Sequence, residues 1–70
     1  MIYRVFAAIS DICWREALPR VLYDDFEKAC HAADEKFLND TFDHDFVVAE
    51  HRDAPELYRA AKHLSPTEVK

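Results

Sequence analysis

The sequence predicts a small α+β domain in which one main helix packs on a three-stranded sheet, with the element order β-β-α-β-α. Two observations carry this prediction. Residues 2–10 alternate with a period of two, and apolar residues between Phe26 and Leu38 recur every three or four positions. A chain of 70 residues fits one domain, which we place at residues 1–64, with a frayed tail at residues 65–70.

The first two strands are expected to pair as an antiparallel hairpin. The first spans Ile2 to Ser10, which is rich in strand-forming residues. The following stretch, residues 11–23, allows two interpretations, because Arg20 to Tyr23 fits a strand while Leu22 also continues the helical stripe that follows. The helix start signal just after Tyr23 favours the strand.

The next element is an amphipathic helix, which the sequence defines best. Asp24 can cap it, and Glu27, three residues later, completes a capping box, so the helix should begin at Asp25. Asn39 and Asp40 should end it, with Asn39 in place of a C-cap glycine, because the chain contains no glycine. Its apolar stripe should lie in the core and consists of Phe26, Ala29, Cys30, Ala33, Phe37 and Leu38.

The remaining chain predicts a third strand and a short second helix. The β-branched centre of Phe46 to Arg52 suits a strand, which could pair with either earlier strand and in either direction. Asp53 and Glu56 form another capping box. Helical spacing then continues through Leu57, Ala60, Ala61 and Leu64.

Composition excludes several classes of function. The net charge is −5 and no basic cluster occurs, which disfavours direct binding of nucleic acid. The longest apolar run, Val5 to Ile9, is too short to cross a membrane, and the opening residues lack the features of a secretory signal. We therefore expect a cytoplasmic protein with reduced cysteines. The absence of glycine also removes every glycine-dependent phosphate or dinucleotide motif.

No pattern of residues indicates an active site. Cys30 is followed by His31, but neighbours on a helix point about 100° apart and do not face each other. Paired carboxylates are explained by capping and by solvated loops. We expect no enzymatic activity, no cofactor and no metal. An alternative is a small metal or ligand site that uses His31, His44 or His51.

The acidic residues on and after the helix are the best candidates for function. They are either a solvated face or an electronegative surface that binds a basic partner, and aromatic residues outside the apolar stripes could anchor that contact. The predicted partner-binding residues are Asp24, Glu27, Asp34, Glu35, Asp40, Asp43, Asp45, Trp14 and Tyr58. A different alternative is a homodimeric structural or accessory protein that self-associates through a sheet edge or the Trp14 region.

The layout of an opening strand, a second strand ending at Val21-Leu22-Tyr23, an acid-capped helix at Asp25-Phe26-Glu27-Lys28-Ala29 and a strand at Phe46-Val47-Val48 resembles small bacteriophage early proteins. It is most similar to short podovirus inhibitors of bacterial RNA polymerase, and it also resembles compact anti-CRISPR proteins. The resemblance implies a stoichiometric binder of a host protein in the host cytoplasm, with acidic residues on a basic surface that would otherwise contact nucleic acid.

Overall fold

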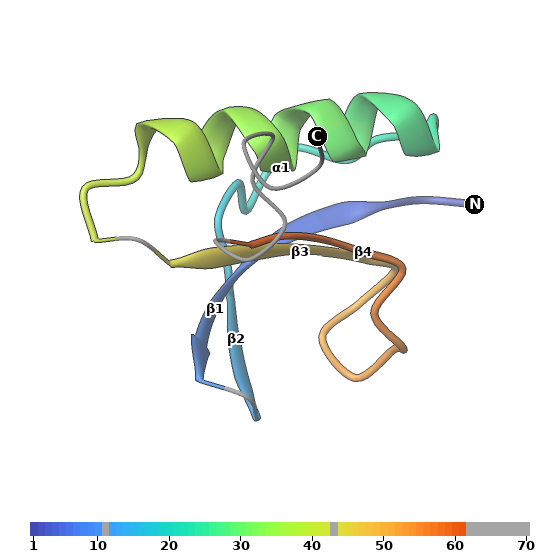
Figure 1. The fold of residues 1–70 in the computed structure, drawn as a ribbon. Coiled ribbons are helices and arrows are strands. Elements are labelled where there is room, and N and C mark those ends of the chain that lie inside the picture. Colours follow the sequence, from blue (N-terminus) through green and yellow to red (C-terminus); the bar gives the residue numbers. More distant parts are fainter. Residues whose placement is uncertain (11, 43, 62–70) are drawn as a thin grey trace.

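The computed structural model describes residues 1–10, 12–42 and 44–61. In this part of the chain a four-stranded antiparallel sheet is covered on one face by one helix, so the α+β class is confirmed (Figure 1). The sheet has four strands where three were predicted, in the order β2-β1-β3-β4. The elements are β1 (Arg4–Ser10), β2 (Cys13–Glu16), α1 (Phe26–Asn39), β3 (Asp45–Ala49) and β4 (Tyr58–Ala60).

The second strand is β2, and the prediction of a strand at residues 20–23 was wrong. Residues 6–8 of β1 pair with β2 on one edge and with β3 on the other. The later segment therefore pairs only just before β1, where Tyr23 and Tyr3 form an isolated antiparallel bridge. Its two backbone hydrogen bonds measure 2.7 and 3.0 Å. The hairpin itself was predicted, but with the wrong partner strand.

Helix α1 lies where the sequence predicted it, but its ends differ. The N-cap is Asp25 rather than Asp24, and an Asp25 side-chain oxygen accepts a hydrogen bond of 3.0 Å from the backbone N–H of Glu27. The C-cap is Asp40, with φ −79° and ψ 127°. Because the chain leaves the helix in an extended conformation, no left-handed residue is needed, and Asn39 does not replace a glycine.

Strand β4 replaces the predicted second helix. Tyr58 pairs with Val48 of β3, and the backbone N–H of Leu57 donates to the carbonyl of Val48 at 2.9 Å. Pairing with the free edge of β3 thus makes this segment a strand, although its apolar spacing also fits a helix. Strand β3 pairs antiparallel with β1 and ends at Ala49, three residues before the predicted end. Leu64 and the predicted tail lie outside the described residues.

The core lies between helix and sheet. Ala29 and Ala33 of α1 are fully buried, and their small side chains let the helix approach the strands closely. The predicted stripe is only partly core, because Phe26 is 38% and Leu38 73% exposed. Cys30 and Phe37 are partly buried and pack against the core cluster. The buried core cluster consists of Val5, Ala29, Ala33, Phe46, Val48 and Ala60.

The sheet face opposite α1, here called the open face, is also partly buried. The register places Glu16, Phe6, Val47 and Arg59 in one row across the four strands on this face. Phe6 is 1% exposed and Val47 is fully buried. The ring of Trp14 lies 5.8 Å from that of Phe6. The β1–β2 hairpin and the loop of residues 50–57 both extend from this side of the sheet (Figure 1).

Candidate partner-binding surfaces

Several of the predicted binding carboxylates make contacts within the domain instead. Asp34 accepts a hydrogen bond of 2.7 Å from the hydroxyl of Tyr58. Asp40 accepts one of 2.6 Å from the backbone N–H of His44 and lies 3.3 Å from the Nδ1 of that ring. Asp45 forms an ion pair of 2.9 Å with Arg59. Because each group already has a partner, these carboxylates are less available to another protein.

Tyr58 was predicted to be a binding anchor, but its hydroxyl ties β4 to α1. The hydrogen bond to Asp34, followed by burial, raises the pKa of Tyr58 to about 12. On the open face, the hydrogen bond that Arg59 donates to Glu56 raises the pKa of Arg59, although burial lowers it. Both side chains therefore stabilise the position of β4, Tyr58 through its bond to α1 and Arg59 through its ion pair with β3.

Cys30 has the properties of a core thiol. Burial raises its pKa, and the negative charges of Asp34 and Glu27 raise it further. A reactive thiolate needs the opposite shift. Cys13, by contrast, is exposed on β2.

The carboxylates left exposed gather at the start of α1. Asp24, Asp25 and Glu27 are all exposed, and we call these three the acidic helix start. Glu35 is exposed two turns further along the helix. Asp43, the remaining predicted acid, lies outside the described residues.

Apolar side chains border the acidic helix start. Phe26 is 38% exposed, and its ring lies 5.5 Å from that of Tyr3 in an edge-on arrangement. The hydroxyl of Tyr3 lies 3.4 Å from the sulfur of Met1, which is 76% exposed. Met1, Tyr3 and Phe26 are here called the aromatic patch. Sequence reasoning missed it because the helical period assigned Phe26 to the core, and only the packing of the chain start shows otherwise.

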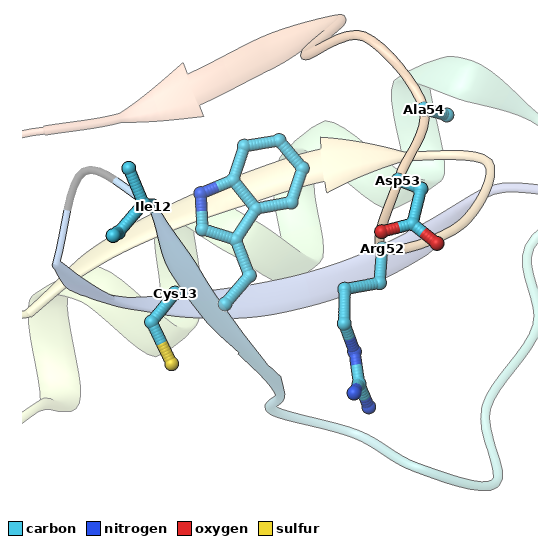
Figure 2. A pocket seen from close by; sticks show the side chains of 6 residues that line it. Ile12, Cys13, Arg52, Asp53 and Ala54 are labelled. Carbon is cyan, nitrogen blue, oxygen red and sulfur yellow. The ribbon is translucent and has the colours of Figure 1, made fainter.

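Trp14 lines a hollow of about 350 Å³ on the open face, together with Ile12, Cys13, Arg52, Asp53 and Ala54. Ile12 and Cys13 come from the hairpin, and the other labelled residues come from the loop that follows β3 (Figure 2). A second hollow, of about 290 Å³, shares Arg52 and Asp53 with the first. We call the two together the open-face groove. No periodic pattern in the sequence indicates it, because tertiary structure brings the two segments together.

Strand β2 forms one edge of the sheet. The backbone N–H of Ala17 donates to Val5 at 3.0 Å, so Ala17 and, by alternation, Arg15 bond toward β1. The backbone groups of Trp14 and Glu16 therefore point away from the sheet. Ile12 beside them is 96% exposed.

The histidines considered as metal ligands lie apart in the chain. His31 is on α1, His44 is in the loop before β3, and His51 follows β3. Among the residues that the structure describes, no three or more His, Cys, Asp or Glu side chains are grouped to hold a metal ion.

The chain has no match among protein-family models, curated proteins or solved structures. Within the described ranges, no helix has the length and apolarity needed to span a membrane.

Proposed function

We propose that this chain is a non-enzymatic protein-binding module that uses the acidic helix start to bind a basic surface of a nucleic-acid-handling protein. Its role would be that of a small bacteriophage inhibitor in the host cytoplasm, as the resemblance implies; the helix and the strand at Phe46-Val47-Val48 fit that resemblance, whereas the strand expected at Val21-Leu22-Tyr23 does not form. The observation that carries the proposal is that the predicted acids Asp24 and Glu27 remain exposed, beside the exposed N-cap Asp25. Three other predicted acids instead make contacts within the domain, namely Asp34, Asp40 and Asp45.

Electrostatic attraction accounts for the type of partner. The chain carries a net charge of −5, so basic surfaces approach it favourably and acidic ones do not. Charged groups of this kind mainly set the association rate and the choice of partner. Two exposed cations, Arg20 and Lys28, lie close to these acids in the sequence, and their two positive charges do not cancel the three negative ones.

The aromatic patch supports protein binding over simple solvation. Carboxylates that only solubilise a surface need no exposed aromatic neighbour. Phe26 and Met1 instead offer a contact area that a partner can desolvate, and methionine adapts to different apolar surfaces. A surface with an apolar centre and a charged margin is the usual composition of a protein interface.

The test is capture of a partner from a bacterial lysate by the tagged protein, followed by measurement of the dissociation constant with the purified partner. Asp24→Lys combined with Glu27→Lys should weaken binding at least tenfold, and raised salt should weaken binding by the wild type. Asp53→Lys is the matched control, because it reverses an exposed charge on the other side of the sheet. Equal weakening by the control, with both folds intact by circular dichroism, would refute the site.

The second candidate function is a homodimeric accessory protein, and the exposed edge of β2 favours it. An unpaired edge can add a strand from another molecule. Sedimentation analysis decides this point, because a strict monomer at high micromolar concentration would eliminate the homodimer.

A further inference from the structure

Strand β2 is an outer strand of the sheet and presents an edge to which another strand can be added. The backbone groups of Trp14 and Glu16 point away from the sheet along this edge. Residues 12–16 include neither proline nor lysine, which commonly protect such edges. Ile12 and Cys13, at the start of the edge, are both exposed. The edge is therefore accessible to a pairing strand.

A second copy of this chain would pair its own β2 with this edge about a two-fold axis. Such pairing is antiparallel, and its hydrogen bonds join residues whose backbone groups both point outward. Within β2 these residues are Trp14 and Glu16, which allows three registers. Trp14 faces Trp14 of the second copy, Trp14 faces Glu16, or Glu16 faces Glu16.

Charge disfavours two of these registers. When Trp14 faces Glu16, the axis passes through Arg15, and the Arg15 side chains of the two copies lie directly opposite each other. When Glu16 faces Glu16, two carboxylates lie opposite each other. Like charges directly opposite in a sheet are destabilising. The register with Trp14 at the axis brings no like charges of β2 face to face.

The register with Trp14 at the axis also joins apolar groups. The ring of Trp14 lies 5.8 Å from that of Phe6, so two such pairs would form one aromatic row across the axis on the open face. On the other face, Cys13 would lie opposite Arg15 of the second copy. Glu16 keeps its ion pair of 2.9 Å within its own chain, so the one carboxylate of β2 stays paired.

We propose that the edge of β2 binds a second copy of this chain about a two-fold axis at Trp14, so that two sheets become one continuous antiparallel sheet. This inference rests on the homodimer described above as the second candidate function, and it assigns the residues and the register of that contact. A second copy is the occupant because the edge is complementary to itself in this register.

The first test is sedimentation equilibrium of the reduced protein at several salt concentrations. Two copies that each carry a net charge of −5 repel each other, so raised salt should strengthen the dimer. Binding of a basic partner by the acidic helix start should respond in the opposite direction. A strict monomer at high micromolar concentration would overturn both the homodimer and this register, and it would leave the acidic helix start unaffected.

The register is read in the unmodified protein by nuclear magnetic resonance on a mixture of isotope-labelled and unlabelled chains. Residues that lie opposite each other without hydrogen bonding in an antiparallel pair have Cα atoms about 4.5 Å apart, so their Hα protons give a strong signal. We expect this signal between Cys13 of one copy and Arg15 of the other. A signal between the two Arg15 residues, or none from β2 in a dimeric sample, would overturn the register alone.

Charge variants at Cys13 test the same contact. Cys13→Glu places a carboxylate opposite Arg15 of the second copy and should tighten the dimer about fivefold, although it makes the net charge more negative. Cys13→Lys places a like charge there and should weaken the dimer about fivefold. The matched controls are His31→Glu and His31→Lys, because His31 is exposed on α1 and not on the edge of β2. If Cys13→Glu weakens the dimer as His31→Glu does, the register is wrong.

Hydrogen exchange distinguishes a strand of another protein as the occupant. In the homodimer the backbone N–H of Trp14 donates to the second copy, so its protection should rise with protein concentration. If the protein is monomeric and this N–H becomes protected only when a partner captured from the lysate is added, the edge binds a strand of that partner. That result would overturn the proposal.

Discussion

The hydrogen bond between the Tyr58 hydroxyl and Asp34 ties β4 to α1 and should be measurable as stability. Tyr58→Phe removes this bond of 2.7 Å and little else. A hydrogen bond to a charged group contributes about 1.5–3 kcal/mol in buried settings. The rise in the pKa of Tyr58 to about 12 corresponds to an upper limit of about 3 kcal/mol. Because both residues are only half-buried, solvent reduces the expected loss to about 1 kcal/mol.

Urea unfolding of the wild type and Tyr58→Phe at neutral pH checks this value. Thermal unfolding gives a second readout, because for a domain of this size a loss of ~1 kcal/mol lowers Tm by about 4–8 °C. The double variant with Asp34→Ala should lose less stability than the sum of the single variants, since both remove the same bond. Additive losses, or an unchanged Tyr58→Phe variant, would refute the role of this bond.

The same bond predicts a specific alkaline pH dependence. In the unfolded chain Tyr58 loses its proton near its ordinary pKa of 10, whereas in the folded protein it keeps the proton up to about 12. The stabilisation is therefore fully present below pH 10 and is lost as the pH rises to about 12. The difference in unfolding free energy between the wild type and Tyr58→Phe should shrink over this range. A constant difference would contradict the assignment.

Three further substitutions test the fold. Asp25→Ala should cost about 1 kcal/mol as the loss of the N-cap, whereas Asp24→Ala should change stability by under about 0.5 kcal/mol, and the reverse order in urea unfolding would restore Asp24 as the cap. Ala33→Leu should cost about 1–3 kcal/mol by overpacking the contact between α1 and the sheet, and a neutral result in thermal unfolding would show that the helix is not closely packed there. Arg59→Gln should destabilise the domain by about 1 kcal/mol, because Arg59 forms ion pairs with Asp45 of β3 and with Glu56 just before β4. The loss should be smaller in high salt, and Arg20→Gln, at an exposed arginine, serves as a control that should have little effect.

The strong periodic signals in the sequence predicted β1 and α1, because each is long enough to show its repeat. The two short strands could not be predicted in this way, because they are too short to show a repeat. β2 has four residues and no apolar alternation, and β4 has three, with a spacing around Leu57 and Ala60 that also fits a helix. Pairing with a neighbouring strand determines both, and strand pairing is a tertiary effect that outweighs local preference.

The candidate site, too, could be predicted from the sequence only in part. The sequence identified the acidic residues and Trp14, but it did not separate carboxylates with internal partners from free ones. The partners of Asp34 and Asp45 lie 24 and 14 positions away along the chain. Only the fold brings these side chains together. It also exposes Phe26, which local periodicity had placed in the core.

The most direct measurement of the central claim is the dissociation constant of the captured partner for the wild type, for Asp24→Lys with Glu27→Lys, and for Asp53→Lys. We predict that the first variant binds at least tenfold more weakly and that Asp53→Lys binds as the wild type does. Wild-type affinity in the helix variant, with its fold intact, would contradict the claim that the acidic helix start is the binding surface.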